Sequence, residues 1–213
     1  MTDPLSRHTD YGQQPLLESE VLADPIAQLQ LWLGHADEAS VYEPNAMVLS
    51  TIDPDGMPSS RTVLLRALDE NGLEFFTNYG SEKGRALLAH PEVSVVFPWY
   101  PIHRQVIVRG TAEPTDPAVS DAYFASRPQG SQIAAVASEQ SRPIASRDLL
   151  EQRVRELEQQ YGDGEVPRPE TWGGFRIQPS RIEFWQGRSS RMHDRLRFTL
   201  SEGSDWQVER LQP

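Results

Sequence analysis

Short runs in which apolar and polar residues alternate make up most of the chain after residue 45. Residues 104–113 show the pattern well, with Val106 and Val108 alternating against Gln105 and Arg109. A period of two places successive side chains on opposite faces of a strand, and clusters of Asp, Pro, Asn and Gly between the first runs are typical of tight turns. The pattern predicts strands at residues 46–52, 59–68, 73–78, 93–99, 104–113, 174–177, 181–185, 195–200 and 206–211.

Helical spacing of apolar residues occurs in other segments. Asp24 followed by Pro25 is typical of an N-cap with proline at the first helical position. Leu150, Val154 and Leu157 recur at the spacing of one helix face. We therefore predict helices at residues 25–39, 81–90, 117–126 and 146–161, with one or two helical turns at 131–137. The first helix is expected to pack on a sheet.

The order of these elements indicates an α+β fold that is mainly β, with helices inserted into a closed or partly closed antiparallel β-barrel. The βαβ alternation of a nucleotide-binding parallel sheet is missing, and so is any G-x-G-x-x-G or G-x-x-x-x-G-K-[ST] loop. Side chains must then hold the phosphate of any nucleotide-like cofactor. No Gly/Ser-rich linker divides the chain, so we predict a single domain at 23–213, preceded by a mobile arm at 1–22.

Composition narrows the possible functions. The 213 residues include 20 Lys and Arg against 31 Asp and Glu, for a formal net charge of −11, which argues against nucleic acid or an anionic membrane as partner. The absence of cysteine excludes disulfides and thiolate chemistry. The N-terminal residues lack a basic region followed by an apolar run, and no segment has the apolar length of a membrane span. We expect an unprocessed protein of the cytoplasm.

The segment Arg191-Met192-His193-Asp194-Arg195 is the first candidate for chemistry. If it is extended, Arg191, His193 and Arg195 lie on one face, and such crowded cations suit an anionic ligand that carries phosphate. The alternative is a solvated strand end that pairs with Asp194 and other nearby acids.

Three further clusters could hold phosphate or a heterocycle. Arg61 and Arg66 lie five residues apart in one predicted strand, so they point to opposite faces. Lys83 and Arg85 lie beside a helix start that Ser81 would cap. Phenol, guanidinium, hydroxyl and amide groups gather at Tyr123, Arg127, Ser131, Gln140 and Ser141. Each cluster alone is also compatible with an ordinary polar surface.

Other common chemistries have no support. The five histidines lack metal-ligand spacing, so we predict no metal site. No H-E-x-x-H motif and no G-x-S-x-G nucleophile elbow occurs.

Taken together, these segments resemble the pyridoxamine (pyridoxine) 5′-phosphate oxidase family, in order from about residue 24 to the end. The motifs that carry the resemblance are Pro44-Asn45-Ala46-Met47, Arg61-Thr62-Val63-Leu64-Leu65, Phe76-Thr77-Asn78-Tyr79-Gly80-Ser81, Arg104-Gln105-Val106, Ser126-Arg127-Pro128 with Ser131-Gln132-Ile133, Trp172-Gly173-Gly174-Phe175-Arg176, Glu183-Phe184-Trp185-Gln186-Gly187, Arg191-Met192-His193-Asp194-Arg195 and Arg210-Leu211-Gln212-Pro213. The resemblance implies an FMN-binding split β-barrel that works as a homodimer, with flavin sites across the subunit interface.

It also implies oxidation of pyridoxine 5′-phosphate or pyridoxamine 5′-phosphate to pyridoxal 5′-phosphate, with O2 reduced to H2O2. By matching motif, the residues expected around FMN are Arg61, Arg66, Phe76, Thr77, Lys83, Gln105, Gln140, Ser141, Trp185 and Arg195. Those expected at the substrate are Tyr11, Arg66, Tyr123, Arg127, Ser131, Arg191 and His193, of which Arg191 and His193 are the expected catalytic pair.

Three positions depart from the family pattern. Arg66 stands where lysine is usual, Glu82 stands where a basic residue is common, and His8 with Arg7 replaces the Arg-x-x-Tyr lid motif before Tyr11. These changes leave open the preferred vitamer, the turnover and a secondary pyridoxal-phosphate site. The alternatives are a flavin or pyridoxal-phosphate binding protein with weak or no oxidase activity, and a split-barrel reductase with another flavin-like cofactor.

Overall fold

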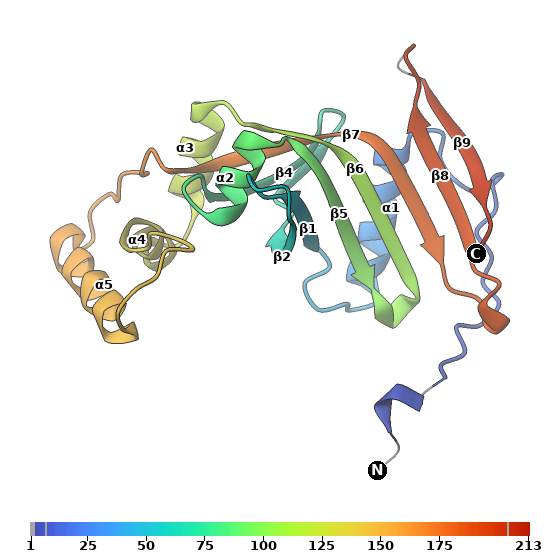
Figure 1. The fold of residues 1–213 in the computed structure, drawn as a ribbon, viewed down its shortest axis with the longest axis horizontal. Helices are drawn as coiled ribbons and strands as arrows, with labels where there is room; N and C mark the ends of the chain where they lie inside the picture. Colours follow the sequence, from blue (N-terminus) through green and yellow to red (C-terminus); the bar gives the residue numbers. More distant parts are fainter. Residues whose placement is uncertain (1–2, 7, 204) are drawn as a thin grey trace.

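The computed structural model describes residues 3–6, 8–203 and 205–213. Within this part of the chain, one antiparallel sheet of nine strands curls into a half-barrel (Figure 1). Helices α3 to α5 lie at one end of the molecule, and strands β8 and β9 lie at the other. The strands are β1 (Ala46–Ile52), β2 (Pro58–Leu64), β3 (Ala67–Asp69), β4 (Gly72–Asn78), β5 (Glu92–Trp99), β6 (Arg104–Pro114), β7 (Trp172–Gln186), β8 (Asp194–Leu200) and β9 (Trp206–Leu211).

The helices follow the predicted capping signals closely. The Asp24 side chain accepts a hydrogen bond from the Ile26 amide at 2.9 Å, and Ser81 caps the next helix by accepting from the Gly84 amide at 3.2 Å. The α-helices are α1 (Pro25–Glu38), α2 (Glu82–Ala89), α3 (Pro117–Ser126), α4 (Gln129–Ala137) and α5 (Arg147–Tyr161), with short 3-10 turns η1 (Pro4–Ser6), η2 (Tyr100–Ile102) and η3 (Ser189–Arg191).

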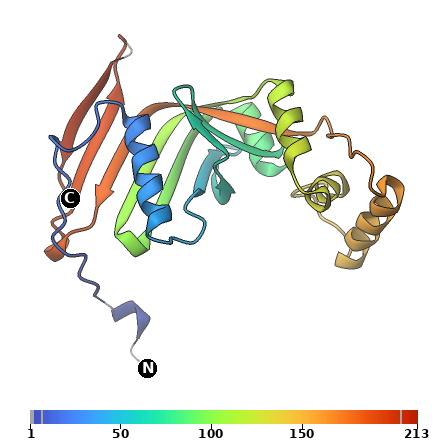
Figure 2. The same ribbon diagram turned by 180° about the vertical axis from the view of Figure 1, so that it is seen from behind.

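The core lies between the concave face of the sheet and α1, which crosses that face (Figure 2). Val106 and Val108 are fully buried there, as their alternation predicts. The rings of Trp32 on α1 and Phe184 on β7 pack edge to face with centroids 5.1 Å apart, which confirms that the first helix packs on the sheet. Each large side chain buried in this way contributes about 1.5–3 kcal/mol.

Strand β7 corrects one prediction. Two strands are predicted here, at 174–177 and 181–185, yet β7 runs unbroken from Trp172 to Gln186. A register shift at Arg109/Gly110 of β6 faces Pro179, and a bulge of this kind tolerates a proline within a sheet. The strand then pairs with β4 through its first half and β8 through its second, so it joins the two ends of the molecule.

The predicted strand at 59–68 is also wrong in its extent. It ends at Leu64, and a separate strand β3 begins at Ala67. Between them the Arg66 amide donates to the Glu74 carbonyl at 2.8 Å, so the chain leaves the edge of β1 and joins that of β4. The predicted short helical segment at 131–137 begins two residues earlier, at Gln129.

Part of the predicted arm packs against the sheet. Leu16 is buried, and its amide donates to the Asp194 carboxylate at 3.1 Å. The division into an arm at 1–22, its mobility and a single domain at 23–213 stays a prediction. No helix in the described ranges is both long and apolar enough to cross a bilayer.

Candidate active site

A cleft of about 580 Å³ opens between β2, β4 and helices α3 to α5. It brings together eight of the residues predicted from the sequence, which are Arg66, Phe76, Thr77, Lys83, Tyr123, Arg127, Ser131 and Gln140. The other walls come from Thr62, Val63, Leu64, Asn78, Ala134, Ala135, Ser138, Leu150, Val154 and Trp172. Residues from seven elements and three connecting segments therefore meet in one concave site.

Lys83 lies at the buried side of this cleft, in the first turn of α2. Its ammonium donates to Thr77 Oγ1 at 3.3 Å and to Gln140 Oε1 at 3.1 Å. No carboxylate lies within ion-pair distance of it in the described part of the chain. Burial lowers the pKa of Lys83, and the nearby charge of Arg61 lowers it further. A buried cation with neutral partners suits an anionic ligand.

Arg127 provides the second cation of the cleft. Its guanidinium lies 4.6 Å from the ring centre of Trp172 and 5.5 Å from that of Phe124. Its Nη1 is buried and has no hydrogen-bond partner in the described ranges. Burial also lowers the pKa of this guanidinium. An unpaired buried donor is costly, and a ligand that supplied an acceptor to Nη1 would remove that cost.

Flat aromatic rings form one wall of the same cleft. Phe76 and Tyr123 stack with centroids 3.9 Å apart, and Trp172 lies parallel to both. The guanidinium of Arg66 lies 6.0 Å from the Tyr123 ring. Trp172 was not predicted as a site residue, although its Trp172-Gly173-Gly174 motif was a signal, and Gly173 leaves no room for a Cβ beside the Tyr79 hydroxyl.

Arg61 and Ser141 lie outside the cleft lining. Arg61 donates to Thr51 Oγ1 at 2.7 Å and to Ser59 Oγ at 2.9 Å, while Arg66 lines the cleft. The two arginines do not share one strand, because β2 ends at Leu64. That they point to opposite faces stays a prediction. Ser141 lines a smaller neighbouring pocket of about 290 Å³.

A second group of predicted residues gathers where β7 turns into β8. Gln105 pairs with Trp185 across β6 and β7, and Trp185 pairs with Arg195 across β7 and β8. Arg195 donates to Glu183 at 2.8 Å. The imidazole of His193 lies 4.7 Å from the Trp185 ring, measured between centroids. Strands β6, β7 and β8 and the loop between β7 and β8 thus bring a tryptophan, an amide, a guanidinium and an imidazole together beside the β7–β8 turn.

The N-terminal segment adds a phenol to this second group. The Tyr11 ring lies 5.6 Å from His193, 6.0 Å from Trp185 and 4.9 Å from His103. His8, Tyr11, Arg188 and Arg191 line a pocket of about 340 Å³ beside it. Arg7, part of the altered lid motif, lies outside the described residues.

The expectation that Arg191, His193 and Arg195 share one strand face is wrong. Arg191 ends the 3-10 turn η3 with φ of 60°, and β8 begins only at Asp194. Arg191 is exposed, whereas His193 is half-buried. Burial lowers the pKa of His193, and the charge of Arg191 lowers it further. The three side chains therefore come from a turn, a loop and a strand, and not from alternation along one strand.

These features define a class of protein. The curled antiparallel sheet with inserted helices is the split β-barrel, and its cationic, aromatic-walled cleft is suited to phosphorylated aromatic ligands. The profile of the family "Pyridoxamine 5'-phosphate oxidase" matches residues 33–161, and that of "Pyridoxine 5'-phosphate oxidase C-terminal dimerisation region" matches 172–213. The chain belongs to the pyridoxamine 5′-phosphate oxidase family.

Similar proteins agree with this assignment. A pyridoxine/pyridoxamine 5′-phosphate oxidase of Cyanothece is 51% identical over 204 residues, 96% of this chain and 95% of the relative. One from Rubrobacter xylanophilus is 52% identical and covers 96% and 94%. The crystal structure of PhzG from Burkholderia lata, in complex with tetrahydrophenazine-1-carboxylic acid, has a TM-score of 0.88 at 33% identity and covers 93% of this chain and 98% of PhzG.

Proposed function

We propose that this chain is an FMN-dependent oxidase that converts pyridoxine 5′-phosphate or pyridoxamine 5′-phosphate to pyridoxal 5′-phosphate, with O2 reduced to H2O2. The observation that carries the proposal is the cleft itself, in which Lys83 is buried and Arg127 is half-buried, both without a carboxylate partner in the described ranges. Full-length relatives near 50% identity that bear this activity in their names support the same conclusion.

The donor set of the chain fits FMN. Lys83, Thr77 and Gln140 together offer an ammonium, a hydroxyl and an amide, which suit a phosphate and polar ring edges. Arg61, Arg66, Phe76 and Ser141 would complete the surroundings, with Gln105, Trp185 and Arg195. When bound, FMN supplies the two-electron redox chemistry that none of the chain's own side chains can provide.

The substrate phosphate requires a second set of cations. Arg127 has an unpaired Nη1, and Arg66, Tyr123 and Ser131 line the cleft near it. A phosphate monoester there would satisfy the guanidinium and hydrogen-bond the two hydroxyls. The parallel rings of Phe76, Tyr123 and Trp172 restrict the cleft to flat ligands and help to exclude water.

The two groups of site residues lie apart within one chain, since α3 to α5 and the β7–β8 turn are at different ends (Figure 1). We infer that a homodimer unites them, so that the β7–β8 group of one copy completes the cleft of the other. The match of residues 172–213 to a dimerisation region supports this arrangement. In it, Arg191 and His193 would contact the pyridine ring, and Tyr11 would cover it.

An aerobic assay tests the proposal. The FMN-loaded protein is incubated with each phosphorylated vitamer, and pyridoxal 5′-phosphate and peroxide are measured together. We expect both products in equal amounts. A yellow protein that forms neither at millimolar substrate would instead be a binding protein, and a different cofactor mass after denaturation would indicate a related reductase.

The role of Arg191 has a separate test. Replacing Arg191 with Met is expected to lower turnover by more than it lowers FMN retention, because Arg191 is assigned to the substrate. Equal losses of turnover and FMN would contradict that assignment. The cytoplasmic location and the absence of a resident metal stay predictions.

A further inference from the structure

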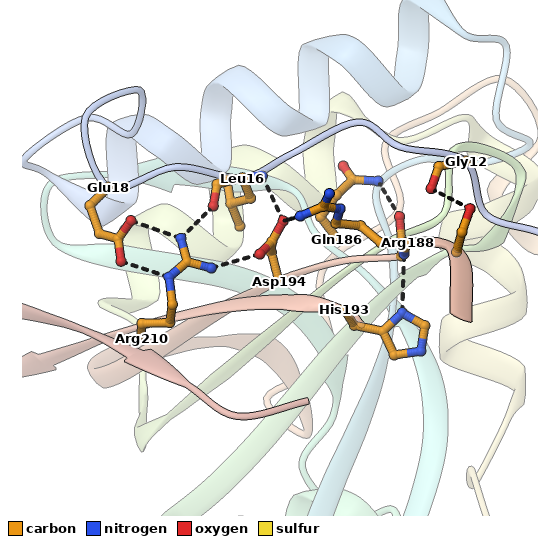
Figure 3. Close-up of polar contacts among 10 residues, drawn as sticks. Gly12, Leu16, Glu18, Gln186, Arg188, His193, Asp194 and Arg210 are labelled. Carbon is orange, nitrogen blue, oxygen red and sulfur yellow. Dashed lines mark hydrogen bonds and ion pairs between the residues drawn. The ribbon is translucent and has the colours of Figure 1, made fainter. Parts of the chain in front are cut away.

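Asp194 is a buried carboxylate to which neither the resemblance nor the cleft assigns a role. It is 7% exposed, at the first position of β8. Its Oδ1 accepts from Arg210 Nη1 at 2.7 Å, and its Oδ2 accepts from Arg188 Nη1 at 3.3 Å and from the Leu16 amide at 3.1 Å (Figure 3). A carboxylate with this many donors connects β8, β9, the β7–β8 loop and the N-terminal segment.

Arg188 also contacts His193, through its main-chain amide. The Arg188 amide donates to His193 Nδ1 at 3.1 Å. A main-chain N–H can only donate, so Nδ1 must be unprotonated, and the neutral imidazole carries its proton on Nε2. Figure 3 shows the other ring nitrogen turned away from the Asp194 network. The contact therefore selects one tautomer and leaves Nε2–H free to donate elsewhere.

The backbone around Arg188 needs external support to stay in place. Ser190 and Arg191 both have positive φ, at 57° and 60°, in a loop without glycine after Gly187. Each such residue costs about 1–3 kcal/mol and persists only where surrounding contacts impose it. The N-terminal segment supplies contacts on one side, where the Ser189 amide donates to the Gly12 carbonyl at 2.8 Å and the Ser189 hydroxyl lies against the Asp10 carboxylate. The Arg188–Asp194 pair supplies a contact on the other side.

We propose that Asp194 is a positioning residue that anchors Arg188, so that the Arg188 amide holds His193 as the Nε2–H tautomer and directs this donor to the substrate. That the acceptor is the substrate rests on the proposed function. Asp194 itself does not touch the reacting atoms. Arg210, which also pairs with Glu18 at 2.7 Å, fixes the carboxylate from the opposite side.

The direct test is the ¹⁵N NMR spectrum of the histidine-labelled FMN holoenzyme near pH 7.5, with His193 assigned by a His193→Asn variant. We expect an unprotonated Nδ1 and a protonated Nε2. A proton on Nδ1 in the unmodified protein would overturn the proposal. This readout needs no turnover, so it stands even if the aerobic assay shows that the proposed function is wrong.

Asp194→Asn keeps the shape of the side chain and removes its charge. We expect a mixture of His193 tautomers and a fall in kcat on the order of tenfold, with a smaller change in KM, because a misplaced catalytic group loses orientation. A folded variant with the original tautomer, whatever its kcat, would overturn the proposal.

Two further variants complete the design. Glu209→Gln makes the same carboxylate-to-amide change at an exposed carboxylate of the same sheet, which pairs with Arg197, and should alter neither the spectrum nor kcat. Arg188→Met should reproduce the effects of Asp194→Asn, and the double variant should be no worse than either. Additive losses would contradict the linkage, and Arg188→Met decides the question if Asp194→Asn fails to fold.

Discussion

The variant Arg127→Met tests whether Arg127 serves phosphate binding or the stability of the fold. The change keeps the length of the side chain but removes the guanidinium whose Nη1 is buried and unpaired in the described structure. If the group exists to bind phosphate, its removal should harm binding while leaving the fold nearly intact.

The magnitude follows from the contacts. Removing an unsatisfied buried donor recovers about 1–3 kcal/mol. Losing the interactions with the Trp172 and Phe124 rings costs about 0.5–1 kcal/mol each at a partly exposed site. The two effects nearly cancel, so stability should change by no more than about 2 kcal/mol, most often as a gain. Losing a hydrogen bond to a charged phosphate costs about 1.5–3 kcal/mol, which is roughly a 10- to 150-fold rise in KM.

The assay compares the KM of pyridoxine 5′-phosphate with the thermal stability of the cofactor-free protein. Arg168→Met is the matched control, because the Arg168 side chain donates to the Asp121 carboxylate and to the Trp172 carbonyl, both at 2.6 Å. The control should lose stability. An Arg127→Met variant that loses several kcal/mol of stability and keeps its KM would refute the reasoning.

Three other predictions follow from single groups. Lys83→Met should weaken FMN binding at least tenfold by flavin fluorescence titration, because it removes the buried ammonium; unchanged affinity would exclude Lys83 from the FMN site. Glu18→Gln should cost less than about 1 kcal/mol near neutral pH, since the ion pair with Arg210 is exposed. The pair with Arg210 lowers the pKa of Glu18 from 4.5 to about 2. The stability that the pair contributes is therefore complete above pH 4.5 and is lost as the pH falls to about 2. Chemical denaturation across this window should show the unfolding free energies of the variant and the unmodified protein becoming equal at low pH. Arg191→Met should raise the pKa of His193 in an NMR titration, because burial and the Arg191 charge both lower it, and a fall would show that Arg191 does not act on the imidazole.

Local signals in the sequence determined the elements that depend on neighbouring residues. The caps at Asp24 and Ser81, and the alternation in β6, each act over a few residues, and the structure has them where they were predicted. The ordered motifs also identified the family. Eight predicted site residues meet in one cleft because strand β4 and helices α2 to α4 bring their ends together.

The tertiary structure decided the features that depend on contacts between distant parts of the chain. Two strands are predicted at 174–177 and 181–185, but β7 continues between them through Pro179, opposite a register shift on β6. Arg191 is predicted to be extended, but it ends the turn η3 with a backbone conformation in the left-handed region of φ and ψ. Trp172 and Asp194 acquire their surroundings from segments far away in the chain, with Leu16 lying 178 residues before Asp194. Period and capping are set by nearest neighbours, whereas bulges, loop conformations and buried ion networks depend on partners that only folding brings into contact.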